Sequence, residues 1–264
     1  MILTAQIVCL AVLAGYGFIT FRKYPFHMEI KPMVQISFLL VLALALSYFS
    51  LMVGAFGFPS LKIGISQVPL ILIGSLYGPG YGFIAGLIYD VLGLIVTPTD
   101  LPFLGFTLGN VLVCSVPGWI MDYVKPGSYR KVRAGVIALT VLMSAFLCGS
   151  MWIMKENFPF EMTLSERTAV TVFACVYPVL MWAAMKIMEK HRSGQAEEIR
   201  LLLSVLAVDA VINLFLNPLW LQIMYGIPYF ASFALRLVKL LAVVPIDGIL
   251  VTVLYNVSKR FRRR

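Results

Sequence analysis

Nine apolar runs separated by short polar connections dominate the pattern of hydrophobic and polar positions along the chain. They lie at about 1–21, 33–57, 64–77, 81–97, 102–123, 133–154, 167–188, 199–224 and 229–257. A helix needs about 20 apolar residues to cross a bilayer, so most runs are long enough to span it. The two shorter runs, 64–77 and 81–97, are separated by the turn sequence GPGYG. The pattern predicts an all-α, polytopic membrane helical bundle of about nine membrane segments.

Composition narrows the class of protein further. The 264 residues are 61% hydrophobic and 12% charged, whereas about 25% of residues are charged in a soluble domain. No connection is long enough for a soluble domain, so residues 1–264 are expected to form a single integral membrane domain. The first run has no basic segment before it and no small-residue cleavage site after it. We therefore expect a retained helix rather than a signal peptide.

The basic residues are concentrated in alternate connections and in the C-terminal tail KRFRRR. The opposite connections hold only Lys62, Lys155 and Arg167. Because cytoplasmic connections carry the excess of Lys and Arg, this distribution places the N-terminus outside the cell and the C-terminus in the cytoplasm. Membrane orientation also explains the net charge of +9. The sequence has no aromatic-basic patch, so nothing in it indicates a nucleic acid partner.

Polar residues recur inside the last two runs. Three lie four residues apart and share one helix face, with an indole following on the same side: Asp209, Asn213, Asn217 and Trp220. The next helix carries Arg236 and Lys239 three residues apart, where an unpaired charge is costly. The two helices are antiparallel neighbours joined by the turn YGIP. These groups are therefore expected at similar depth in the outer half of the membrane, around a water-accessible pocket open to the outside.

A structural interpretation of the same residues stays open. Asp90 and Asp209 are also intramembrane, so the two cations would pair with them, and the asparagines would form interhelical hydrogen bonds. Against this, Asp209 is expected to lie deeper than Arg236, and Asp90 near the midplane. The outer group also includes Trp220 and Tyr225, which suit stacking on a flat ring. Asp247, near the inner end of its helix, is expected to be interfacial.

Small residues mark two helix faces for close packing. Gly82 and Gly86 lie four residues apart, and the second run carries Ala43, Ala45 and Ser47. Such stripes allow close approach of a neighbouring helix or a partner subunit. The segment GPGYGFIAG is not a nucleotide loop, because it lacks the Lys-Ser/Thr ending of a phosphate-binding loop and follows no strand.

The remaining chemistry-bearing residues form no recognisable centre. The four cysteines and two histidines have no metal-ligand spacing. We find no carboxylate–histidine cluster and no activated serine motif. The sequence therefore predicts no metal site, no cofactor and no enzymatic activity.

Three segments, in chain order, resemble the substrate-binding S-components of energy-coupling-factor (ECF) vitamin transporters, with the folate-specific members most similar. The first contains the pattern GPxxGxxxGxxxDxxG, which matches at Gly78, Pro79, Gly82, Gly86, Asp90 and Gly93. The second is PFLGFTLGNVLV, and the third contains LNxLWL at 216–221 and RxxK at Arg236 and Lys239. The resemblance covers about 33–125 and 197–258.

The resemblance implies a six-helix core that captures a vitamin from outside the cell, in the plasma membrane of a bacterium. It also implies two kinds of partner, a membrane coupling (T) protein and two cytoplasmic ATPases that drive uptake. Residues 1–32 would then be an extra N-terminal helix with its cytoplasmic loop, and 132–190 an inserted helical pair. The family's AxxxA contact motif is not intact. Val41 to Ala45 stands in its place, with Ala43 to Ser47 as a substitute.

The resemblance also assigns roles to the polar residues. Arg236 would clamp a carboxylate in a bidentate manner and Lys239 would add a second charge. Asn213 and Asn217 would read the donors and acceptors of a ring, and Trp220 would stack on it. Lys62 and Gln67 lie where the first outer loop would close over the ligand. Folate fits these roles, and pantothenate or biotin would use the same cations. The alternative from another class is a non-transport membrane scaffold or assembly protein.

Overall fold

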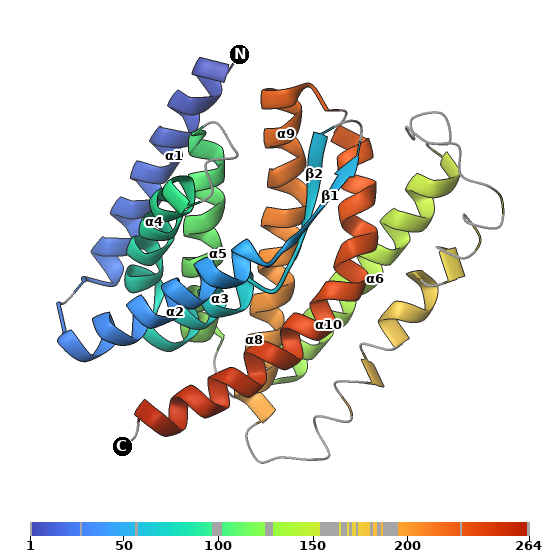
Figure 1. The fold of residues 1–264 in the computed structure, drawn as a ribbon. Helices are drawn as coiled ribbons and strands as arrows, with labels where there is room; N and C mark the ends of the chain where they lie inside the picture. Colours follow the sequence, from blue (N-terminus) through green and yellow to red (C-terminus); the bar gives the residue numbers. More distant parts are fainter. Residues whose placement is uncertain are drawn as a thin grey trace.

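The computed structural model describes residues 2–26, 28–55, 58–96, 102–124, 129–153, 195–227 and 229–262, with scattered positions between 164 and 186. Figure 1 shows the helices gathered into one bundle, with the two termini at opposite ends. The elements are α1 (Ile2–Lys23), α2 (Ile30–Tyr48), β1 (Leu51–Ala55), β2 (Phe58–Ile63), α3 (Gln67–Tyr77), α4 (Pro79–Val96), α5 (Leu104–Tyr123), α6 (Tyr129–Ile153), α8 (Gln195–Val208), η3 (Asp209–Leu216), α9 (Asn217–Tyr225) and α10 (Tyr229–Arg262).

The predicted helical membrane bundle is confirmed. Within the described ranges, five helical segments are long and apolar enough to cross a membrane: Ile2–Lys23, Ile30–Tyr48, Pro79–Val96, Leu104–Tyr123 and Glu197–Tyr225. The run predicted at 64–77 is the short helix α3 of 11 residues. Of the run predicted at 167–188, the structure describes scattered positions, the longest stretch being 174–179.

The run predicted at 33–57 is not one helix. Helix α2 ends at Tyr48, and the chain continues as the antiparallel hairpin β1–β2, whose register shifts between Val53 and Gly54. Glycine is unfavourable inside a helix, and Pro59 lacks the backbone N–H that a helix would need. Strand β2 contacts α10, and Figure 1 shows the hairpin in front of the bundle beside α9 and the first half of α10.

Glycines bring α3 and α4 into direct backbone contact with α5. A Cβ atom built on Gly82 would lie 2.3 Å from the carbonyl oxygen of Cys114, and one on Gly86 would lie 2.5 Å from the Cα of Val111. On α3, the Cβ position of Gly74 is likewise filled by the Cys114 backbone. Gly82 and Gly86 therefore face α5 inside the chain, and their predicted role against a partner subunit does not fit this packing.

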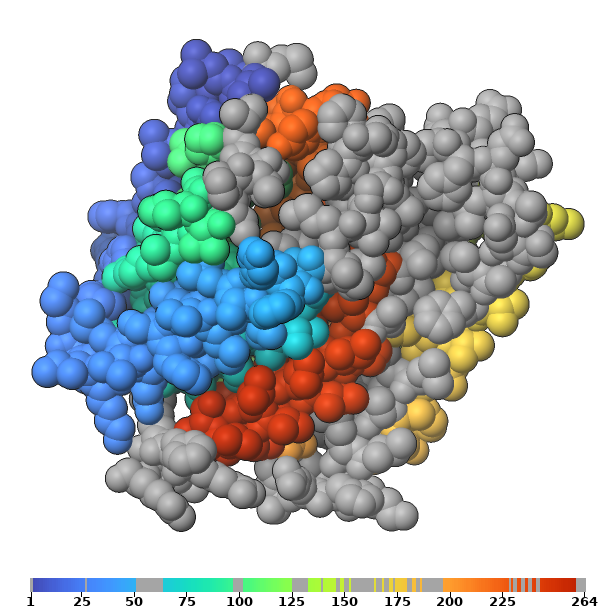
Figure 2. Space-filling model, viewed as in Figure 1, coloured from blue at the N-terminus to red at the C-terminus, as the bar shows by residue number. Residues whose placement is uncertain are grey.

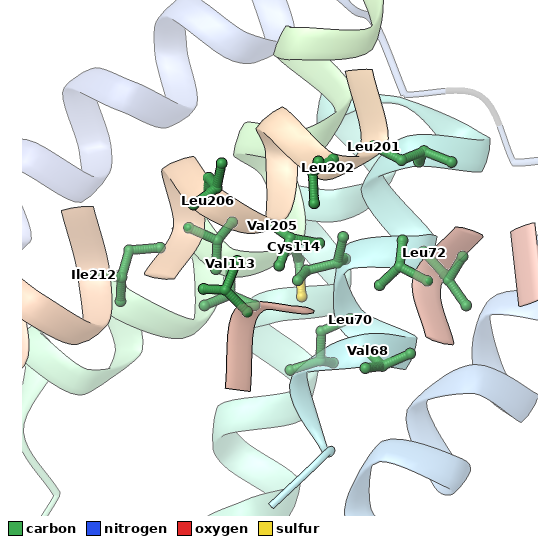
Figure 3. Close-up of a cluster of buried hydrophobic side chains, with 14 of the residues drawn as sticks. Val68, Leu70, Leu72, Val113, Cys114, Leu201, Leu202, Val205, Leu206 and Ile212 are labelled. Atoms are coloured by element: carbon green, nitrogen blue, oxygen red, sulfur yellow. The ribbon is translucent and has the colours of Figure 1, made fainter. Parts of the chain in front are cut away.

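Helix α3 forms the centre of the core. Every residue from Val68 to Leu76 is buried, as expected for a helix that is hydrophobic on all sides. Figure 3 shows Leu201, Leu202, Val205 and Leu206 of α8 meeting Val113 and Cys114 of α5, with Val68, Leu70 and Leu72 of α3 nearby. This packing fixes α8, and with it the position at which η3 begins.

Helix α2 lies on the surface of the bundle, where Figure 2 shows it uncovered at the front. Val41 and Ala45 are exposed, whereas Ala43 is fully buried. Ser47 is half-buried and interacts with the hydroxyl of Tyr89 on α4. Of the small residues predicted to pack against a partner, Ala45 is therefore the one on an open face.

The N-terminal helix is attached to the core at both ends. Near its start, Cys9 is buried in a cluster with Phe103 and Trp220. At its end, Lys23 lies 3.6 Å from the carboxylate of Asp122 and 3.7 Å from the ring centre of Tyr123, both on α5. The ion pair, the cation–π contact and the apolar cluster together hold α1 against α5.

Candidate functional site

A π-helical segment shapes the candidate site. Helix α8 continues directly into η3, and α9 begins at Asn217, one residue before Pro218. A proline has no N–H, and its ring clashes with the carbonyl four residues earlier, so the regular α ladder cannot continue through this position. The chain adopts a wider π turn over the residues before this proline, a feature often found at functional sites.

The polar stripe on η3 and α9 is a hydrogen-bonded ladder. Asn217 Nδ2 donates to Asn213 Oδ1 at 3.0 Å, and Asn213 Nδ2 donates to Asp209 Oδ1 at 2.6 Å. Gln67, at the start of α3, pairs reciprocally with Asn213 at 3.1 and 2.9 Å. Asn213 thus uses both of its amide hydrogens and both lone pairs of its oxygen. It organises the site, because contact with a ligand would require that one of these bonds break.

Helix α10 places its two cations opposite this ladder. A hollow between η3 and α10 has a cavity volume of about 10 Å³, which is room for about one water molecule, and is lined by Asp209, Asn213, Arg236, Lys239, Leu240 and Val243. The Arg236 Nε donates to Ser232 Oγ at 3.4 Å, one turn earlier on the same helix. Sites for drug-sized ligands usually enclose about 300–1,000 Å³. The hollow is far smaller than this, so a ligand with both a ring and a tail would require the site to open.

The two aspartates that the sequence offered as partners for the cations are placed differently. Asp90 on α4 accepts hydrogen bonds from Thr107 at 2.7 Å and Asn110 at 2.8 Å, both on α5. Asp209 is 3% exposed, lines the hollow, and interacts electrostatically with Lys239. Polar side chains of α5 therefore hold Asp90, which the structural interpretation had paired with a cation. Asp209 does lie near Lys239, as that interpretation expected, and also lines the hollow.

Asp247 was expected at the interface, and this prediction is wrong. Its side chain is 1% exposed, and it interacts electrostatically with Lys239 and Asp209. The neighbouring Gly248 lies against Leu202 of α8, which accounts for the burial. The depth of a residue along a helix says nothing about which neighbour it faces, so this burial could not be predicted from spacing.

The remaining predicted residues lie around or outside the hollow. Trp220 is buried and packs against Phe103 with ring centroids 5.6 Å apart, outside the lining of the hollow. Tyr225 is half-buried at the end of α9. Lys62 is on β2, whose side chains lie outside the described part of the structure. The structure thus brings Asn213, Arg236 and Lys239 together around one space and separates Trp220 from it.

Comparisons with known proteins place these features in context. The family model described as "ECF transporter, substrate-specific component" matches residues 5–188. The folate transporter FolT of Clostridium novyi (strain NT) is 26% identical over 164 residues, which cover 61% of this chain and 92% of that protein. A crystal structure of FolT bound with folic acid is similar at 23% identity and a TM-score of 0.49, covering 86% of this chain and 94% of that one. The family match begins within α1 and ends before α8. The roles of residues on η3 and α10 therefore depend on their own geometry.

Proposed function

This chain belongs to the family of substrate-specific components of ECF transporters. On that premise we propose that it captures a carboxylate-bearing vitamin, with folate favoured, from outside the cell for ATP-driven uptake. The observation that carries the proposal is the hollow in which Arg236 and Lys239 of α10 face the amide ladder of η3. The name of the Clostridium novyi relative supports folate among the vitamins considered.

The two cations supply the recognition of a carboxylate. An arginine guanidinium binds a carboxylate through two parallel hydrogen bonds, and such charge-assisted bonds are about twice as strong as neutral ones. The Ser232 hydroxyl accepts from Nε of Arg236 and so restricts the rotation of the guanidinium. Lys239, deeper along α10, provides a second positive charge for the same group or for a second carboxylate.

The ring of the ligand requires more space than the hollow encloses, so binding would open the outer side of the site. Gln67, at the start of α3, holds Asn213 by two hydrogen bonds. The hairpin β1–β2 precedes α3, and β2 contacts α10. We infer that ligand entry separates Gln67 from Asn213 and displaces the hairpin, and that both then close over the bound ring.

The orientation and the partners follow from the same proposal. The distribution of Lys and Arg supports a cytoplasmic C-terminus and an N-terminus outside the cell, and the family match supports the plasma membrane of a bacterium. A coupling protein in the membrane and two cytoplasmic ATPases would supply the energy for release. The exposed face of α2 that carries Val41 and Ala45 is the surface we assign to the coupling protein.

Thermal unfolding of the purified protein in detergent tests the proposal. Folic acid, pantothenate and biotin are added separately, and a specific ligand at about 100 times its Kd stabilises the folded state by ~2.7 kcal/mol. Arg236→Ala should abolish the rise in Tm, whereas Lys31→Ala, at an exposed cation on α2, should retain it. No response to any of the three vitamins would favour the scaffold, and a full response in Arg236→Ala would refute the carboxylate clamp.

A further inference from the structure

Three carboxylate oxygens and one hydroxyl are buried beside the hollow without a hydrogen-bond partner among the described residues. They are Oδ2 of Asp209, both oxygens of Asp247 and the hydroxyl of Tyr177. Each of these side chains is at most 3% exposed. Burying an ionised carboxylate without a partner is far more costly than burying a neutral one, and such groups take up a proton instead. The described part of the chain therefore contains two acids whose charge depends on what lies next to them.

Lys239 is the charged group that both acids share. It interacts electrostatically with Asp209 and with Asp247, and the two carboxylates repel each other. Lys239, Val243 and Asp247 recur every four residues and so lie along one face of α10. Tyr177 interacts electrostatically with Asp209. One ammonium group thus offsets two carboxylates from two different elements.

Several other ionisable or polar groups on α8 and α3, two of the elements that pack against α10, have partners of their own. On α8, Arg200 donates to the backbone carbonyls of Met121 and Val124, Glu197 binds Lys259 at 2.5 Å, and Glu198 accepts from Asn256. On α3, Tyr77 donates to Gln35, Ser75 donates to Ile71, and Gln67 pairs with Asn213. On α10 itself, Arg236 lines the same hollow. Of the described ionisable groups on η3, α3, α8 and α10, the hollow and its immediate surroundings hold Asp209, Asp247, Lys239 and Arg236.

We propose that Asp209 and Asp247 take up a proton when an anionic ligand binds at Arg236 and Lys239, so that the proton is a co-ligand of the site. The two acids and two bases balance when all four are ionised, and a ligand carboxylate adds negative charge that a proton from solvent offsets. The ligand stays ionised, and the proton bonds to an aspartate oxygen, which removes the cost of an ionised buried carboxylate without a hydrogen-bond partner. This inference rests on the proposed function, because it requires an anionic ligand in the hollow.

Isothermal titration with folic acid measures the proton directly. The apparent binding enthalpy at one pH is compared between phosphate and Tris buffers, whose ionisation enthalpies differ, and the difference gives the number of protons taken up. The carboxylates of folic acid are already ionised between pH 6 and 8, because ordinary carboxyl pKa values are about 4. We expect uptake to approach one proton, and Kd to weaken by up to about tenfold for each unit of rising pH.

Asp247→Asn imitates the protonated acid and has no contact with the amide ladder among the described hydrogen bonds. We expect this variant to take up less of the proton, to show a flatter dependence of Kd on pH, and to bind more tightly than wild type at pH 8. Asp209→Asn provides a second variant if the first does not fold. Asp122→Asn, at an exposed carboxylate of α5 that pairs with Lys23 of α1, is the matched control and should behave as wild type.

The outcomes separate this inference from the proposed function. Binding of folic acid by the wild type with no proton uptake between pH 6 and 8 would overturn the inference and leave the proposed function intact. Unchanged uptake in both aspartate variants would also overturn it. A Kd that depends on sodium at constant ionic strength would assign the acids to a metal cation instead. If neither folic acid nor the other two vitamins bind, the proposed function itself fails.

Discussion

The reciprocal hydrogen bonds between Gln67 and Asn213 are expected to couple α3 to η3 energetically. The perturbation is a double-mutant cycle with Gln67→Ala, Asn213→Ala and the combined variant. Hydrogen bonds between membrane helices contribute on average about 0.6 kcal/mol and at most about 1.7 kcal/mol. Since two bonds join this pair, the interaction energy should be about 1.2 kcal/mol, with an upper bound of about 3.4 kcal/mol.

Asn213→Ala alone should cost more than Gln67→Ala alone. The asparagine also donates to Asp209 and accepts from Asn217, so its removal leaves four partner groups without their bonds, whereas Gln67→Ala removes two bonds. Leaving a buried polar group unsatisfied costs more than the net contribution of the bond, because the group has already lost its water. The order of the two single variants is therefore a second, independent outcome of the same experiment.

The assay is the free energy of unfolding in mixed micelles, measured for all four proteins under one set of conditions. Gln67→Ala combined with Asn256→Ala is the matched control, because Asn256 bonds to Glu198 near the C-terminal end of α10. Effects at separated sites add to within about 0.3–0.5 kcal/mol. An interaction energy for Gln67 and Asn213 no larger than this control would refute the ladder as the connection between α3 and η3.

Three further predictions concern packing and orientation. Gly86→Ala should destabilise the protein by about 1–3 kcal/mol, because its Cβ would lie 2.5 Å from Val111 Cα. Gly93→Ala on the same helix is the control and should be neutral or stabilising, because nothing lies within 4 Å of its Cβ position. Equal thermal shifts in the two variants would contradict the contact between α4 and α5. Cys148 and Cys175, whose sulfurs are 4.0 Å apart, should form a disulfide under copper–phenanthroline, losing two thiol protons and two electrons to the oxidant. Free thiols are counted before and after oxidation, and an unchanged count would contradict the contact between Cys148 and Cys175. A peptide tag at the C-terminus should resist protease added to intact spheroplasts while one at the N-terminus is cleaved; the reverse pattern would invert the orientation.

The sequence predicted the helices well because a bilayer leaves few alternatives. Backbone groups inside hydrocarbon must be satisfied within the segment, so an apolar run of sufficient length is a helix. The run 81–97 corresponds to α4 at Pro79–Val96, and 102–123 to α5 at Leu104–Tyr123. The same reasoning failed at 33–57, where apolar residues continue past the end of α2 into a hairpin that packs on α10. Hydrophobicity alone cannot distinguish a membrane helix from a strand that packs on the protein, because both give a continuous run of apolar residues.

The candidate site was predicted in part. Spacing alone put Asp209, Asn213 and Asn217 on one face, and the structure joins them in a ladder. Spacing could not predict the π turn, because the choice between hydrogen bonds to the fourth and the fifth preceding residue depends on tertiary packing and on Pro218. It also could not predict that Gln67, 146 residues earlier in the chain, completes the ladder. Such a contact follows from the position of α3 against η3, which the sequence pattern does not encode.

The internal partners at the site imply that ligand binding exchanges one set of interactions for another. Asn213 has no free hydrogen-bonding capacity, and Lys239 already offsets two carboxylates. Affinity then depends on the difference between the ligand's interactions and the internal ones that they replace. Substitutions should therefore act with opposite signs. Arg236→Ala removes a group that binds the ligand and weakens binding, whereas Asp247→Asn removes a competitor for the ammonium group and strengthens binding at pH 8. Weakening by both would mean that the buried acids support the ligand-bound state.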